Sequence, residues 1–150
     1  MENALGRTPV HLWIVGAIGF LWNGFGCFDY FMTRTRGAAY IESMMRTADG
    51  EAIMVYINGF PIWAAVGWGL GVWGGFAGAI LLLMRHRSAV PVLLVSLVGA
   101  IVGIVYQLAN PSGIAELSKG ANAVIPYVII VIAIALFVYA RAMRMRGVLR

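Results

Sequence analysis

Four long apolar segments, separated by short charged breaks, constrain this chain more than any other feature. They lie near 9–32, 61–84, 89–108 and 123–140. The hydrocarbon core of a bilayer is about 30 Å thick and an α-helix rises about 1.5 Å per residue, so each segment is long enough for one crossing. The sequence therefore predicts an all-α integral membrane bundle of four transmembrane helices, with residues 1–150 forming a single domain.

The composition agrees with a chain that is solvated mainly by lipid. Hydrophobic residues make up 61% of the sequence and charged residues only 11%, whereas soluble domains typically contain about 25% charged residues. A soluble chain of this size has too small an interior to hide so much apolar surface. The net charge of +5 is therefore not a nucleic-acid signal, and its distribution along the chain is more informative.

The basic residues are concentrated at the two ends of the chain and at the break between the second and third segments. That group comprises Arg7, Arg85, Arg87, Arg141, Arg144, Arg146 and Arg150. The regions that four crossings place on the other side contain Arg34, Arg36, Arg46 and Lys119. Because cytoplasmic loops carry the excess of Lys and Arg, this bias predicts cytoplasmic N- and C-termini and an external 34–60 loop. The basic tail also suits contact with anionic membrane lipids.

The loop at 34–60 has helical pieces of its own. Tyr40–Arg46 and Glu51–Ile57 each have helical character, and 47–50 separates them with turn and helix-cap residues. Its apolar side chains suit either a strip lying in the membrane interface or an ordered loop packed over the mouth of the bundle.

Glycines recur at four-residue spacing on two of the predicted helices. The second helix has Gly67, Gly71 and Gly75, and the third has Gly99 and Gly103. Helices in lipid gain little from the hydrophobic effect, so faces without side chains allow the close backbone approach that holds them together. These glycines are predicted to be helix-packing residues, either within one bundle or in a homo-oligomer.

The few polar residues inside the predicted helices are the candidate ligand-binding residues. They are Asn23, Asp29, Tyr30, Tyr106 and Gln107. A polar group facing lipid is costly, so these side chains are expected to face inward or to meet water. Helical rise places Asp29 and Gln107 near the outer rim and Asn23 deeper, level with Gly67 and Gly103.

Two interpretations of these polar residues stay open. The first is an outward-opening polar pocket that Asn23 and Gln107 line together, with Asp29 at its mouth. The second pairs Asp29 with Arg34 or Arg36 at the interface and uses Asn23 to join two helices.

The sequence lacks the patterns that mark an enzyme or a metal site. No Ser/His/Asp or Cys/His set can be assembled on one side of the membrane, and metal-ligand spacing is absent. The glycines near Gly71 are not a phosphate loop, because no Gly-Lys-Ser/Thr follows them. We therefore expect no catalytic activity, no metal and no cofactor.

A family resemblance extends over the first three predicted helices. It is carried by Trp22-Asn23-Gly24, Asp29-Tyr30, Pro61-x-Trp63, Trp68, Gly71-Val72-Trp73-Gly74-Gly75, Leu81-Leu82-Leu83, and the stretch from Ala89-Val90-Pro91 to Ser96-Leu97. These residues resemble a group of small bacterial inner-membrane proteins often labelled "sugar transporter". The resemblance implies a bacterial four-span protein of the inner membrane and brings no assigned functional residue with it.

The sequence thus predicts a non-catalytic membrane protein that binds or transports a small polar solute or a lipid at an outward-facing pocket. Two alternatives remain: an accessory or assembly subunit of a larger membrane complex, and, as the weakest, a membrane enzyme. The fourth segment supports the subunit alternative, because it is rich in Ile and Val and has no polar group between Val128 and Val138. Such a face suits either a protein partner or lipid.

Overall fold

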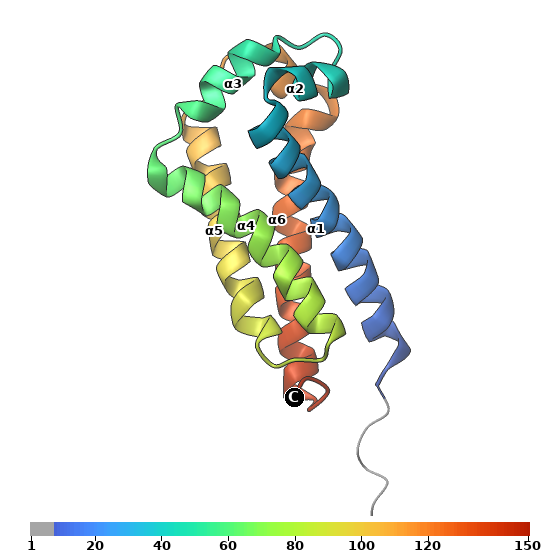
Figure 1. Cartoon of the computed structure of the whole chain (residues 1–150). Helices are drawn as coiled ribbons and strands as arrows, with labels where there is room; N and C mark the ends of the chain where they lie inside the picture. Colours follow the sequence, from blue (N-terminus) through green and yellow to red (C-terminus); the bar gives the residue numbers. More distant parts are fainter. Residues whose placement is uncertain (1–7) are drawn as a thin grey trace, which may run out of the picture.

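The computed structural model, which describes residues 8–150, is helical throughout that range apart from its turns and loops (Figure 1). Its elements in chain order are α1 (Val10–Arg36), α2 (Ala38–Met44), α3 (Gly50–Asn58), α4 (Ile62–Leu83), α5 (Ala89–Ala109), the 3-10 turn η1 (Ala115–Leu117) and α6 (Gly120–Met145). Four of these, α1, α4, α5 and α6, are long and apolar enough to cross a membrane. The predicted all-α bundle with four candidate spans is confirmed.

The first and last spans, α1 and α6, are longer than the apolar segments that predicted them. α1 continues to Arg36, and α6 begins at Gly120 and ends at Met145. Hydropathy reports where the lipid-compatible stretch stops, whereas helical hydrogen bonding continues into the polar region. Arginines at a helix C-terminus, such as Arg34 and Arg36 in the last turn of α1, also interact favourably with the helix dipole.

The closest helix pair is α4 and α5, and glycine makes that approach possible. A Cβ placed on Gly99 would lie 2.7 Å from the Gly67 carbonyl oxygen and 2.8 Å from the Gly71 nitrogen. A Cβ on Gly71 would lie 3.0 Å from the Ala100 nitrogen, and one on Gly103 would lie 3.5 Å from the Trp68 backbone. The backbones of α4 and α5 are therefore in contact where side chains normally separate two helices.

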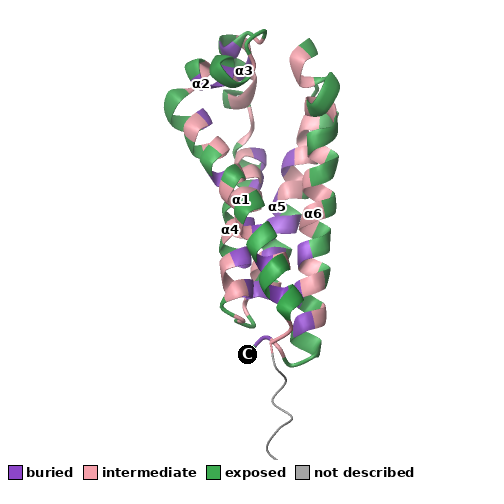
Figure 2. Cartoon of the chain, turned by 90° about the vertical axis from the view of Figure 1, so that its right-hand side faces the viewer, coloured by how far each residue is buried: buried purple, intermediate pink, exposed green. Residues whose placement is uncertain are grey.

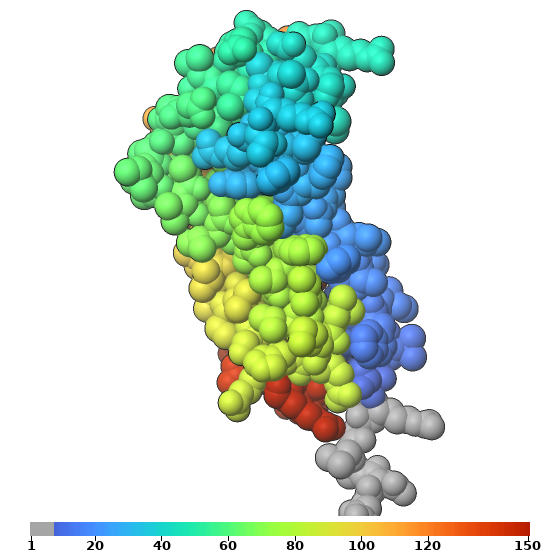
Figure 3. Space-filling model, in the orientation of Figure 1, coloured from blue at the N-terminus to red at the C-terminus, as the bar shows by residue number. Residues whose placement is uncertain are grey.

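The main cluster of buried apolar side chains lies at the end of the bundle that carries the C-terminus, and further buried residues lie in α2 and α3 (Figure 2). Leu12, Leu82, Leu93 and Met143 come from all four spans and are at most 2% exposed. The final residues fold back beneath the α4–α5 turn (Figure 3). There Leu149 is buried in the same cluster, so the chain end is part of the core.

Backbone hydrogen bonds fasten the chain end to the α4–α5 turn. Arg150 N donates to Arg85 O at 2.8 Å, and Arg87 N donates to Arg150 O at 2.9 Å. Arg85 itself has φ +58°, the left-handed conformation that usually needs glycine. Its side chain donates to Val148 O at 3.3 Å, so this residue both ends α4 and holds the tail.

The opposite end of the bundle carries α2 and α3, as a helical hairpin (Figure 1). Asp49 accepts a hydrogen bond from Ala52 N at 2.9 Å and so caps α3, as the turn chemistry at 47–50 predicts. Gly50 packs so tightly on α2 that a Cβ there would lie 2.6 Å from Ala38 O. Tyr56 reaches back to the bundle by donating to Asn110 O at 2.8 Å. Residues 34–60 thus form an ordered structure rather than an open loop.

The α4–α5 contact yields a stability prediction. Gly99→Ala forces two backbones apart, because the added methyl collides with atoms that cannot rotate away. We expect a loss of about 1–3 kcal/mol, measured as a lower melting temperature in detergent.

Gly26→Ala in α1 is the matched control. A Cβ at Gly26 meets nothing within 4 Å, and alanine is preferred over glycine in a helix interior by about 1 kcal/mol. Equal melting temperatures for the two variants would contradict the close α4–α5 contact.

Candidate functional site

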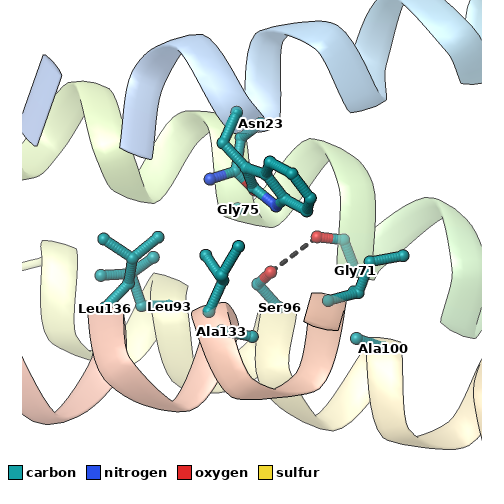
Figure 4. A pocket seen from close by; sticks show the side chains of 11 residues that line it. Asn23, Gly71, Gly75, Leu93, Ser96, Ala100, Ala133 and Leu136 are labelled. Atoms are coloured by element: carbon teal, nitrogen blue, oxygen red, sulfur yellow. Dashed lines mark hydrogen bonds between the residues drawn. The ribbon is translucent and has the colours of Figure 1, made fainter. Parts of the chain in front are cut away.

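A cavity of about 30 Å³ lies between all four spans, near the middle of their length. Its polar lining comes from Asn23 of α1 and Ser96 of α5, and Gly71 and Gly75 of α4 form another wall. The α6 wall is apolar and includes Ala133 and Leu136 (Figure 4).

Asn23 is positioned by a hydrogen bond within its own helix. Its Nδ2 donates to Gly19 O at 2.7 Å, which turns the carboxamide oxygen toward α4. A Cβ on Gly75 would lie 2.1 Å from Asn23 Oδ1, so the amide occupies the space that any other residue at 75 would fill. The structure therefore places Asn23 against Gly75, not level with Gly67 and Gly103 as helical rise predicted.

Ser96 faces the same point from α5. It is 4% exposed, and its hydroxyl donates to Gly71 O at 2.6 Å (Figure 4). The Cβ position on Gly75 lies 3.1 Å from Ser96 Oγ. The oxygens of Asn23 and Ser96 thus converge over Gly75, and three helices contribute to one polar spot inside an apolar bundle.

The size and chemistry of the cavity restrict what it accepts. A volume of 30 Å³ suffices for about one water molecule, which also needs two or more polar partners. The Asn23 amide and the Ser96 hydroxyl supply donors and acceptors without charge. No charged side chain lines the cavity, so its chemistry favours a neutral hydrogen-bonding group over an ion.

The α6 wall belongs to the most exposed of the four spans. Of the most apolar 18-residue window in each span, 11% is buried in α6 and 44% in α5. α6 meets α1 through a hydrogen bond between His11 and Tyr139 and through Leu136 packed on Gly19. The buried residues of α6 all lie from Leu136 onward, and toward the other end Asn122 contacts Met45 outside the spans.

Two other predicted site residues, Asp29 and Tyr30, lie nearer the α2–α3 end. Asp29 accepts a hydrogen bond from Tyr40 of α2 at 2.9 Å. Tyr30 packs edge-on against Trp68, with ring centroids 4.7 Å apart, and the Arg34 guanidinium lies over both rings. Arg34 also donates to Asn58 at 3.5 Å, so the structure joins these residues to the α2–α3 hairpin.

The remaining two, Tyr106 and Gln107, are also outside the cavity lining. Tyr106 packs against Phe60 and Trp63, at centroid distances of 4.9 and 5.4 Å. Gln107 donates to Gly103 O in its own helix at 3.4 Å. The structure thus brings Asn23 together with Ser96, and it does not place Gln107 in the lining of the same cavity. Whether any of the five binds a ligand stays a prediction.

Ser96 lines the cavity but is not among the five candidate ligand-binding residues predicted from the sequence. The signal was present, because serine in a small-residue face of a membrane helix is the usual way to bring a hydroxyl to a close helix contact. Gln107 was predicted from its polarity, whereas the packing of α4 against α5 brings Ser96 to the cavity.

The Asp29–Tyr40 hydrogen bond lies at the junction of α1 and the α2–α3 hairpin. Burial raises the pKa of Tyr40 to about 12, and the hydrogen bond to Asp29 and its negative charge add to the effect. The phenol is therefore held in its neutral, donating form. No three His, Cys, Asp or Glu residues within 8–150 lie close enough together to hold a metal ion.

Comparison of the chain with models of known protein families, with curated proteins and with solved structures finds no match. The structure itself shows an α-helical bundle with four candidate membrane spans and a small neutral cavity between them.

Tyr40→Phe tests the junction of α1 and α2. Because the folded-state pKa of Tyr40 is raised from 10 to about 12, its contribution to stability is complete below pH 10 and is lost as pH rises toward 12. We expect Tyr40→Phe to lower the free energy of unfolding by about 1–3 kcal/mol at pH 8 and to flatten the decline between pH 10 and 12. A wild-type decline that persists in the variant would assign it to another group.

Proposed function

We propose that this protein binds a small uncharged polar molecule between its four spans and lets it pass toward the α2–α3 end. The observation that carries the proposal is the convergence of the Asn23 and Ser96 oxygens on Gly75 inside the central cavity. Polar side chains in a membrane interior are costly and are therefore expected to have a function. A role in substrate binding, without catalysis, explains why two neutral hydrogen-bonding groups share one space.

Passage of anything larger than water requires the cavity to widen. In this proposal α6 is the wall that moves. α6 makes few contacts with α1 and α4, and those with α1 are Leu136 on Gly19 and Tyr139 with His11. Pro126 within α6 also removes one helical hydrogen bond. A membrane helix tolerates proline where neighbours or water re-satisfy the freed carbonyl. In this proposal α1, α4 and α5 form a fixed unit, and α6 moves against it.

We further propose that the α2–α3 end faces outward and that both termini lie in the cytoplasm. The excess of arginine at the end that carries the α4–α5 turn and the C-terminal tail supports this orientation. The resemblance to small bacterial inner-membrane proteins labelled "sugar transporter" supports the bacterial inner membrane as the location and a neutral polyol or sugar as the substrate class.

Cysteine labelling tests the orientation. In a Cys27→Ala background, an impermeant thiol reagent applied to intact cells should modify Asp49→Cys and leave Arg146→Cys unmodified. Asp49 caps α3 and is exposed, and Arg146 follows α6 at the opposite end. The reverse pattern would overturn the orientation.

Transport is tested with purified protein in liposomes and glycerol as the probe. Light scattering after an osmotic step should show faster glycerol entry than in empty liposomes. Asn23→Leu keeps a side chain of similar size that suits the membrane but removes the amide. We expect this variant to lower the protein-dependent rate by at least about tenfold, the loss expected when about 1.4 kcal/mol of stabilisation disappears.

Gln107→Leu is the matched control, since it removes the same amide from a residue outside the cavity lining. It should keep the wild-type rate, and Ser96→Ala should behave like Asn23→Leu. If all three variants equal a wild type that itself exceeds empty liposomes, the cavity is not the route. If wild type equals empty liposomes for glycerol, transport of this class fails and the accessory-subunit alternative takes its place.

A further inference from the structure

A second hollow lies at the α2–α3 end, away from the central cavity. It has a volume of about 350 Å³ and is open to the surface. One side is the turn between α2 and α3, with Met45 and Thr47, and the other is η1 and the start of α6, with Ala115, Glu116, Lys119 and Asn122. We refer to these six residues as the outer groove.

Asn122 connects the two sides of the outer groove. Its Nδ2 donates to Glu116 O at 3.0 Å and contacts Met45 Sδ at 3.1 Å. The first contact fixes η1 on α6, and the second ties α6 to the α2–α3 turn. Both use the amide nitrogen, so the carbonyl oxygen remains an acceptor, and Thr47 adds a hydroxyl.

The outer groove carries one charge of each sign. Glu116 and Lys119 are three residues apart, across the η1 turn, and both line it. A ligand with a single negative charge would meet repulsion from Glu116, and one with a single positive charge would meet repulsion from Lys119. A molecule with both a cationic and an anionic group satisfies the two side chains together.

The position of the outer groove suits a ligand at the membrane surface. Gly120 begins α6, and its apolar run starts a few residues later, at Ala123. Lys119 and Glu116 therefore lie where the polar head groups of a bilayer meet its hydrocarbon core. The apolar residues of α6 that follow are exposed, including Val124 and Val128, so an acyl chain has a surface to run along.

We propose that the outer groove binds a small zwitterion, with its ammonium group on Glu116 and its phosphate or carboxylate on Lys119. Asn122 and Thr47 hydrogen-bond the polar atoms between the two charges. A zwitterionic lipid head group and a free zwitterion share this chemistry. The inference is independent of the proposed transport function, because the residues of the outer groove are separate from those of the central cavity.

Native mass spectrometry of the purified full chain tests the site. The protein is incubated with equal amounts of phosphatidylethanolamine, which is zwitterionic, and phosphatidylglycerol, which is anionic. Wild type should retain more phosphatidylethanolamine. Glu116→Gln and Lys119→Gln should each lower its retention by about threefold, the size expected for one exposed ion pair, and Glu116→Gln should raise the relative retention of phosphatidylglycerol.

Glu51→Gln and Arg36→Gln are matched controls, because they remove one charge of each sign at the same end of the molecule but outside the outer groove. Both should retain lipid as wild type does. A parallel incubation with O-phosphoethanolamine identifies the source: displacement of the lipid by this soluble compound assigns the site to a free zwitterion, and lack of displacement assigns it to the lipid.

Equal retention by wild type, Glu116→Gln and Lys119→Gln, together with no effect of either substitution on O-phosphoethanolamine binding, would overturn the proposal. Retention of phosphatidylglycerol alone would also overturn it, because that result describes a basic surface. Neither result bears on the central cavity, since Asn23 and Ser96 are unchanged in every variant.

Discussion

The close approach of α4 and α5 is the contact on which the rest of the structure depends. Helices in lipid gain little from hiding apolar surface, so their association rests on dispersion and on hydrogen bonds across a short gap. Glycine at 67, 71 and 99 provides that gap by bringing backbone atoms of α4 and α5 into contact. α1 then packs on the other side of α4, and α6 packs mainly on α5.

The same small residues that join the helices also create the site. Gly75 has no side chain to fill the space between α1, α4 and α5, so Asn23 and Ser96 meet there. Each is anchored to a backbone carbonyl, of Gly19 and Gly71 respectively, which limits the cost of burying it. Packing and polarity are thus coupled at one place, and the cavity is neutral because neither group ionises.

The two ends of the bundle are built differently. At the end with the chain terminus, the apolar cluster around Leu12 and Leu82 closes the structure, and Leu149 seals it. At the other end, aromatic rings around Trp68 and the α2–α3 hairpin form an ordered but more polar cap. α6 has its buried residues at the first end, and near the second end its residues are exposed or half-buried, with Asn122 in contact with Met45 and Glu116. An opening of the bundle would therefore be directed toward the hairpin, where the outer groove also lies.

The sequence by itself determined the solvent, the four spans and the caps, because hydropathy, helix length and turn chemistry are local properties. The 18- to 24-residue apolar segments and the helix cap within 47–50 could be predicted without knowing which helices pack together. Only the tertiary structure decided that Asn23 meets Gly75 and Ser96, and that Tyr106 packs on Phe60 and Trp63. Counting residues along a helix gives only an approximate height in the membrane, which placed Asn23 level with Gly67 instead of Gly75, and it gives neither the rotation of the helix nor the tilt of its partner. Rotation and tilt depend on which glycine faces which backbone across the α4–α5 contact. That pairing exists only once the two helices have packed together.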